Sequence, residues 1–254
     1  MDLGLSGARA IITGGSRGIG LAIAKQLVAE GASVAICARG ADGVAAAVAQ
    51  LGDHAWGEAV DVSDAEAYTG WLDRAIDHFD GCDIFIGNVA LFGSPDADLA
   101  DLWRSAFEID LMHCVTGTAH LMPTLEASDR GAVVFTSSVS STLNIGGPEE
   151  GPYGAMKAAL VSYAGKIAEA AGPAGVRVNC VSPGPILFDG GIWDEVRSTE
   201  PELFAMVEQM PALQRMGTAE EVAQTVAFLA SPAASYTTGT SVRVDGGTLK
   251  TANF

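Results

Sequence analysis

A tyrosine and a lysine four residues apart are the side chains of this sequence best suited to move a proton. Tyr153 and Lys157 lie in the run Pro-Tyr-Gly-Ala-Met-Lys, which is typical of a helix, so both project from the same helix face. A phenol has a pKa of about 10, and a nearby ammonium favours the phenolate. The pair can therefore exchange a proton with a carbonyl or alcohol oxygen. The same spacing occurs by chance on solvated helices, but this chain has only four lysines and begins with a glycine-rich loop.

That loop, residues 13–20, reads Thr-Gly-Gly-Ser-Arg-Gly-Ile-Gly and joins an expected strand to an expected helix. Glycines allow a tight turn and a close approach of the backbone to a pyrophosphate, and the helix N-terminus offers free N–H groups. A purely structural turn is the alternative, but the strand–turn–helix context favours a dinucleotide site. No Gly-Lys-Ser/Thr follows, so the loop is not a P-loop. The candidate cofactor-binding residues are Gly14, Ser16, Arg17, Gly18, Ile19 and Gly20.

The residue after the second expected strand predicts which nicotinamide cofactor binds. An NAD site usually carries Asp or Glu there to bind the ribose 2′-hydroxyl, whereas this chain has Arg39. Arg39 and Arg17 together can bind a 2′-phosphate through charge-assisted hydrogen bonds. We therefore expect NADP, with NAD less favoured; two surface arginines are the alternative interpretation.

Segments of strand length alternate with segments of helical period along the whole chain. We expect strands at residues 8–13, 34–38, 55–60, 83–87, 132–136, 176–181 and 241–244. We expect helices at residues 18–30, 41–51, 64–79, 99–125, 153–171 and 219–229. This alternation predicts an α/β fold with a Rossmann-like, doubly wound parallel sheet flanked by helices. No linker interrupts it, so we expect a single domain, 1–254, with its ligands at the carboxyl ends of the strands.

Residues 185–217 interrupt the alternation of strands and helices, and we expect this segment to form a substrate lid. The segment carries the large apolar side chains Phe188, Trp193, Phe204, Met206 and Met210. A segment beside a catalytic site can close over a substrate and exclude water. The same side chains can instead pack the lid onto the body of the protein. The expected partner is a small-molecule carbonyl or alcohol substrate, with an apolar or aromatic compound favoured.

Composition excludes several other classes of function. A formal net charge of −17 repels phosphate backbones and anionic membrane surfaces, so we expect no nucleic-acid and no membrane partner. The start shows no secretory signal, and no apolar run reaches the length of a membrane span, which together favour a cytoplasmic protein. The four cysteines are scattered, so we expect buried free thiols rather than metal ligands or disulfides.

With these motifs the chain resembles a single-domain short-chain dehydrogenase/reductase over essentially its whole length, similar to 3-oxoacyl-carrier-protein reductases. The resemblance implies that Ser138 holds the substrate oxygen beside Tyr153, with Ser140 as an alternative because its distance from Tyr153 is the more common one. It implies that Lys157 binds the nicotinamide ribose and acidifies Tyr153. The other cofactor contacts that it implies are Asp61, Val62, Asn88, Pro183, Gly184 and Ile186.

Three positions depart from the pattern of the family. The family's Asn-Asn-Ala-Gly is Gly-Asn-Val-Ala at residues 87–90, so that Asn88 is retained. Asp110 stands where the resemblance implies a catalytic asparagine that helps to hold a water in the proton relay to the lysine. A carboxylate there would stabilise the ammonium of Lys157 and shift the pH profile. Phe188 replaces a threonine that often follows the Pro-Gly loop.

The sequence thus predicts an enzyme that transfers a hydride between NADP(H) and a secondary alcohol or ketone, with Tyr153 as general acid/base. Enoyl reduction is disfavoured because relatives with that activity have a longer Tyr-to-Lys spacing. A catalytically impaired regulatory or scaffold protein that still binds the cofactor is the alternative from another class. Relatives are commonly tetramers, so we expect a homo-tetramer or a homo-dimer.

Overall fold

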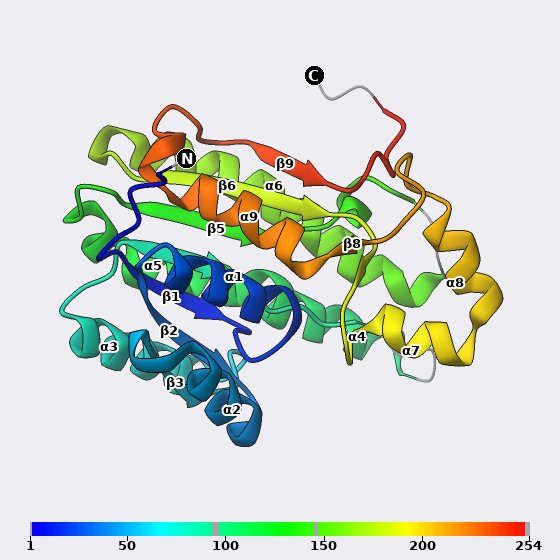
Figure 1. Ribbon diagram of the computed structural model, residues 1–254, viewed down its shortest axis with the longest axis horizontal. Helices are drawn as coiled ribbons and strands as arrows, with labels where there is room; N and C mark the ends of the chain where they lie inside the picture. Colours follow the sequence, from blue (N-terminus) through cyan, green and yellow to red (C-terminus); the bar gives the residue numbers. More distant parts are fainter. Residues whose placement is uncertain (1, 93–96, 145–146, 252–254) are drawn as a thin grey trace.

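A seven-stranded parallel sheet forms the centre of the computed structural model, which describes residues 2–92, 97–144 and 147–251 (Figure 1). The strand order is β3-β2-β1-β4-β5-β6-β9, and every neighbouring pair is parallel. The strands are β1 (Arg9–Thr13), β2 (Ser33–Ala38), β3 (Ala55–Ala59), β4 (Ile84–Gly87), β5 (Ala132–Thr136), β6 (Arg177–Pro183) and β9 (Ser241–Val244). The predicted α/β class with a Rossmann-like parallel sheet is confirmed.

Helices cover both faces of this sheet. Strand β1 shows why, because Ile12 points into one apolar core and Ile11 into the other. The first core is closed by α1 (Gly18–Ala29), α2 (Ala41–Leu51) and α9 (Ala219–Ala230). The second is closed by α3 (Ala65–Phe79), α5 (His113–Glu126) and α6 (Gly151–Ala171). In Figure 1, α1 and α9 lie in front of the strands, and α5 and α6 lie behind them.

The expected single helix at residues 99–125 is wrong in one respect. The segment is helical throughout, but it consists of α4 (Leu99–Ala106), the π-helical stretch η2 (Phe107–Met112) and α5. A π-helical stretch contains one more residue per turn than an α-helix and therefore changes the direction of side chains locally. Asp110 lies within it and is fully buried.

The segment predicted as a lid leaves the body of the protein through a two-stranded neck. Strands β7 (Ile186–Leu187) and β8 (Gly217–Thr218) pair in parallel at its two ends. Between them lie α7 (Ile192–Thr199) and α8 (Pro201–Glu208). Figure 1 shows α7 and α8 on the side toward which the arrowheads of the strands point. The predicted lid is therefore next to the carboxyl ends of the strands, where ligands bind in sheets of this type.

All four cysteines are buried and free, as the sequence predicts. Within the described residues, no helix is both long and apolar enough to cross a membrane. The same residues contain no group of three or more His, Cys, Asp or Glu side chains that could hold a metal ion.

Candidate active site

Helix α6 carries Tyr153 and Lys157 at the carboxyl end of the sheet. Pro152 lies in the first turn of this helix, where its missing N–H group needs no partner. Tyr153 follows directly and is half-buried, and the Nζ atom of Lys157 lies 5.6 Å from the centre of its ring. The side chain of Lys157 is only 1% exposed, and its ammonium donates to the carbonyl of Thr136 at 3.1 Å. The ammonium is thus fixed at the end of β5 and cannot swing into solvent.

Ser138 follows β5 and faces Tyr153. Its hydroxyl accepts the N–H of Ser140 at 3.1 Å and so begins the short 3₁₀ turn Val139–Ser141. The nearby Ser138 hydroxyl lowers the pKa of Tyr153 and so favours the phenolate. Ser140 instead lies on this turn with its carbonyl against Gly154, where a Cβ atom would approach to 2.8 Å. Of the two serines that the sequence leaves open, the structure brings Ser138 to the phenol.

The phenol of Tyr153 is subject to opposing influences. Burial raises its pKa, whereas the Lys157 ammonium and the nearby Ser138 hydroxyl lower it, and the negative charge of Asp110 raises it again. The sum is a pKa above the ordinary value. Tyr153 therefore stays a phenol at neutral pH in the protein without ligands and is poised to donate a proton.

Asp110 is the acidic partner of Lys157. Its Oδ1 atom lies 3.4 Å from the Nζ atom of Lys157 and accepts the N–H of Leu91 at 3.0 Å. Its Oδ2 atom is buried and has no hydrogen-bond partner. Burial raises the pKa of Asp110 despite the nearby ammonium. Burial opposes the charge of Lys157, but Asp110, together with Tyr153 and Cys114, outweighs this effect, so that the pKa of Lys157 is raised.

Asn88 holds the ends of three strands together. Its Nδ2 atom donates to the carbonyls of Thr13 and Gly14 at 3.2 and 3.3 Å, and its Oδ1 atom accepts the hydroxyl of Thr136 at 3.1 Å. Its backbone N–H donates to the hydroxyl of Thr13 at 2.9 Å. Thr13 and Thr136 were not among the predicted site residues. Their positions as the last residues of β1 and β5, the two strands that flank β4, are the signal that identifies them.

The glycine-rich loop fits a pyrophosphate. Gly14 and Gly18 have φ angles of +69° and +54°, which favour glycine. A Cβ atom at Gly20 would overlap the carbonyl oxygen of Gly14, so helix and strand approach as closely as backbones can. Helix α1 has no side-chain cap and no acidic residue in its first turn, whereas Asp64 caps α3 with its carboxylate. The first N–H groups of α1 are therefore available to an anionic ligand.

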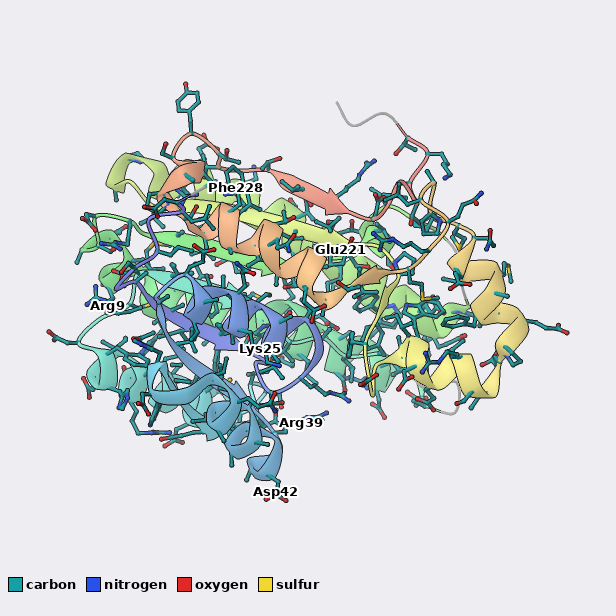
Figure 2. All side chains as sticks on the ribbon, viewed as in Figure 1. Arg9, Lys25, Arg39, Asp42, Glu221 and Phe228 are labelled. Atoms are coloured by element: carbon teal, nitrogen blue, oxygen red, sulfur yellow. The ribbon has the colours of Figure 1, made fainter. Side chains whose placement is uncertain are left out.

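The two arginines of the predicted phosphate clamp differ in position. Arg39 is exposed beyond β2 (Figure 2). The pKa of Asp61 is lowered by hydrogen bonds from Ser63 and, to a smaller degree, by the charge of Arg39. The guanidinium of Arg17 donates to the carbonyl of Gly190 at 2.9 Å and so contacts the base of the predicted lid. The structure thus places Arg39 at the predicted ribose end and links Arg17 to the lid.

Phe188 packs on the nucleotide loop. A Cβ atom at Gly18 would lie 2.6 Å from its ring, and one at Gly191 would lie 2.8 Å from it. Pro183 ends β6, Gly184 packs against the backbone of Asp245, and Ile186 begins the neck of the lid. Of the other predicted cofactor contacts, Ser16 and Ile19 are half-buried and Val62 is buried.

The substrate side has an aromatic wall. The ring of Phe92 lies 5.0 Å from that of Tyr153 and is 52% exposed. Of the five apolar lid residues, Met206 is exposed and the others are half-buried. Sequence reasoning missed Phe92, which has no motif of its own. Its place, two residues after the altered Gly-Asn-Val-Ala run, is the only signal for it.

Comparison with known proteins agrees with this geometry. Residues 14–248 match the profile of a protein family described as enoyl-(acyl carrier protein) reductase. A dehydrogenase/reductase of the SDR family from Rattus norvegicus is 32% identical over 94% of this chain and 86% of its own length. The chain belongs to the short-chain dehydrogenase/reductase family.

Several relatives within this family have named activities. The isoepoxydon dehydrogenase of Penicillium expansum is 33% identical over 97% of this chain and 96% of its own length. The cis-4-hydroxycyclohexanecarboxylate dehydrogenase of Sinomonas cyclohexanicum is 35% identical over 94% and 95%. L-sorbose reductase of Gluconobacter frateurii, solved with NADPH and L-sorbose, superposes with a TM-score of 0.89 at 31% identity, covering 99% of this chain and 100% of its own.

Proposed function

We propose that this member of the short-chain dehydrogenase/reductase family interconverts a secondary alcohol and a ketone with NADP(H). The observation that carries the proposal is the convergence of three groups. Tyr153, Lys157 and Ser138 meet at the carboxyl end of β5, beside a helix N-terminus with free N–H groups. The three side chains can exchange a proton with a substrate, and the helix N-terminus can hold a dinucleotide.

NADP is the cofactor that the residues fit. The glycine cradle and the uncapped start of α1 suit a pyrophosphate, and Arg39 replaces the acidic residue typical of NAD sites. A short-chain dehydrogenase from Burkholderia cenocepacia, solved with NADP, is 32% identical with a TM-score of 0.83, which supports the same choice. When bound, NADPH supplies a hydride, with its electron pair, to the carbonyl carbon and leaves as NADP⁺.

The side chains of this protein supply the proton and the orientation. Ser138 donates a hydrogen bond to the substrate oxygen and polarises the carbonyl. The O–H bond of Tyr153 breaks as its proton passes to that oxygen, which becomes the alcohol hydroxyl. Lys157 stabilises the phenolate that remains, because its ammonium is held close to the ring and cannot leave. Alcohol oxidation follows the same steps in reverse.

The substrate class follows from the exposed ring of Phe92 and from the relatives. An exposed aromatic ring beside Tyr153 favours a compound with an apolar face. One relative is named for a hydroxycyclohexane carboxylate and a structural neighbour for a ketose. We therefore propose a cyclic or polyhydroxylated ketone of small size, closed over by the segment 185–217 as a lid.

A substrate panel with matched variants tests the proposal. NADPH oxidation is followed with 4-oxocyclohexanecarboxylate, L-sorbose, simple ketones and an enoyl thioester, using the wild type and Tyr153→Phe. Turnover of a ketone that is lost in Tyr153→Phe is the expected result. Retained NADPH binding with no turnover of any compound would instead support the scaffold alternative, and turnover of the enoyl thioester alone would identify a different reaction.

The choice of cofactor has its own test. In Arg39→Asp, we expect the ratio of NADPH to NADH affinity to fall about 100-fold, because charge-assisted hydrogen bonds are lost and a like charge is added. Arg130→Asp makes the same change of charge at the opposite end of the sheet, where Arg130 contacts the carbonyl of Ser6. That control should leave the ratio unchanged. An unchanged ratio in Arg39→Asp would rule out its role.

The state of assembly is also a proposal. Ala155, Ala158, Ala159 and Gly165 lie on α6, where small side chains permit close helix packing. We propose a homo-dimer or homo-tetramer in the cytoplasm, and light scattering after gel filtration measures the mass directly.

A further inference from the structure

Asp110 has a charge and a setting that the proposed reaction does not require. It is fully buried, and its carboxylate lies 3.4 Å from the ammonium of Lys157. We propose that Asp110 is a positioning residue that neutralises Lys157 and thereby keeps Tyr153 in its phenol form, so that the enzyme is set to donate protons and reduce ketones. This inference rests on the proposed function, because it assigns a direction to the same site.

Geometry is the first argument. The ammonium of Lys157 is the positive charge nearest to the phenol, at 5.6 Å from the ring centre. A lone ammonium at such a distance stabilises a phenolate strongly in a buried site. The Asp110 carboxylate, 3.4 Å from the same ammonium, opposes that effect and raises the pKa of Tyr153. Transfer of the proton from Tyr153 would then leave two negative charges around one positive charge.

The unpaired oxygen of Asp110 is the second argument. The Oδ2 atom is buried without a hydrogen-bond partner, although a buried carboxylate is normally saturated with donors. The N–H of Leu91 is the other donor, and it contacts Oδ1. The charge of Asp110 is therefore compensated mainly by the ammonium of Lys157. This setting differs from that of a carboxylate that merely ties two segments together.

The other titratable groups around this pair are neutral at physiological pH. Burial and the charge of Lys157 lower the pKa of His113 to about 3. Burial raises the pKa of Cys180 to about 12 and also raises that of Cys114. The groups that face Tyr153 are Lys157 from its own helix, Ser138 from the end of β5 and Asp110 from η2. Of these, only Asp110 favours the phenol over the phenolate.

The pH dependence has a defined sign. Asp110 raises the pKa of Tyr153, so removing its charge lowers that pKa. Reduction requires the phenol and is lost as the pH rises through this pKa, whereas oxidation requires the phenolate and is gained there. In Asp110→Asn, both limbs should move to lower pH. Well below the pKa, a shift of one unit raises the phenolate fraction, and hence the rate of alcohol oxidation, about tenfold.

Asp110→Asn is the informative variant because the amide oxygen can still accept the N–H of Leu91. Two readouts are compared with the wild type: kcat for reduction and oxidation between pH 6 and 10, and the tyrosinate absorbance of the free enzyme. Subtracting the spectrum of Tyr153→Phe in each background isolates the titration of Tyr153. The expected result is a lower midpoint and faster oxidation at neutral pH, with little change in KM for NADP⁺.

Asp83→Asn is the matched control, because Asp83 is also a buried carboxylate but lies before β4, at the opposite end of the sheet. The Asp83→Asn variant should have the same midpoint for the titration of Tyr153 as the wild type. Equal Tyr153 midpoints in the wild type and Asp110→Asn would overturn the inference. The absorbance titration needs no substrate, so it decides this point even if the substrate panel shows no turnover.

Discussion

Two acid–base pairs, each with a buried carboxylate, lie at opposite ends of the same sheet, and they are built in different ways. At the amino end, Asp83 accepts four hydrogen bonds, three from Arg9 and one from Ser128, at 2.6 to 2.9 Å. At the carboxyl end, Asp110 has one backbone donor, the ammonium of Lys157 at 3.4 Å and an oxygen without a partner. Hydrogen bonds saturate the first pair, whereas the second is left incomplete.

The pKa values of Asp83 and Asp110 differ in the way that their hydrogen bonding predicts. Burial acts against the charge of both, but the hydrogen bonds from Arg9 and Ser128 leave the pKa of Asp83 lowered. The pKa of Asp110 is raised, because burial outweighs the nearby ammonium. The saturated pair of Arg9 and Asp83 holds the sheet to the adjoining loop. The incomplete pair of Lys157 and Asp110 instead keeps its charge available to neighbouring groups. The comparison indicates which end of the sheet serves stability and which serves chemistry.

The largest expected effect is the loss of activity in Lys157→Met. Without the ammonium the phenolate loses its nearest positive charge, so we expect kcat for ketone reduction to fall about 10²- to 10⁴-fold. Arg9→Met removes the cation of the other pair and should leave kcat nearly unchanged (Figure 2 shows Arg9 far from the lid helices). Steady-state kinetics of both variants under saturating NADPH measures this. Comparable losses in the two variants would contradict the division between the ends of the sheet.

The second effect concerns the nucleotide loop at the carboxyl end. In Gly20→Ala the new methyl group would overlap the carbonyl of Gly14, which cannot move without distorting β1. We expect NADPH affinity to fall about 100-fold or more, since the N–H groups of α1 lose their alignment. Gly43→Ala is the control, because its methyl group would lie 3.8 Å from Ser16 within α2. It should keep affinity and stabilise the protein by up to about 1 kcal/mol. Calorimetric titration and thermal unfolding measure both changes.

The third effect is on stability and tests the amino end. Asp83→Asn should lower the free energy of unfolding by about 1–2 kcal/mol at pH 7, because charged hydrogen bonds to a partly exposed arginine are weakened. The pKa of Asp83 is lowered in the folded protein, so its contribution is full above the ordinary aspartate value. It is lost as the pH falls through the lower folded value.

Asp110→Asn should show the opposite pH dependence. A raised folded pKa means that the ionised carboxylate opposes folding above that pKa, and this opposition disappears as the pH falls. The variant should therefore gain stability relative to the wild type as the pH rises above the ordinary aspartate pKa. Urea unfolding at several pH values measures both differences. If the change in the free energy of unfolding varied with pH in the same way in Asp83→Asn and Asp110→Asn, the two pairs would be equivalent.

Much of this architecture is predictable from sequence because the periodicity of the elements is strong. The expected helix at residues 41–51 and the strand at 241–244 have the bounds that the structure shows. The π-helical stretch Phe107–Met112 was missed, because one extra residue in a turn leaves no mark in a short apolar pattern. The contact between Arg17 and Gly190 was also missed, because it joins positions 173 residues apart and depends on where the lid begins.

The choice between Ser138 and Ser140 shows the same limit within the site. Spacing along the chain favours Ser140, but the 3₁₀ turn that Ser138 begins places the carbonyl of Ser140 against Gly154. Local hydrogen bonding therefore decides which hydroxyl reaches Tyr153, and distance in sequence does not. By contrast, Asp110 was expected near Lys157 from the resemblance, and the structure places its carboxylate there.

The smallest expected effect concerns how the incomplete pair is connected to the substrate. Asp110 accepts the N–H of Leu91, and the next residue, Phe92, is half exposed and packs its ring against that of Tyr153 at a tilt. The carboxylate therefore helps to place the aromatic wall as well as the charge. Phe92→Ala removes apolar surface that a cyclic ketone would cover, so we expect KM for such a ketone to rise about threefold to tenfold with kcat little changed.

Phe228→Ala is the matched control for this variant, because Phe228 is a partly exposed phenylalanine on α9, on the other face of the sheet (Figure 2). Its KM should equal that of the wild type. The combination of Phe92→Ala with Asp110→Asn extends the test, because the two side chains are linked through Leu91. If the Asp110→Asn amide keeps this loop in place, the effect on KM should come from Phe92 alone and the effect on the pH profile from Asp110 alone. A rise of KM in Asp110→Asn by itself would show instead that the charge of Asp110, rather than its oxygen atom, positions the wall.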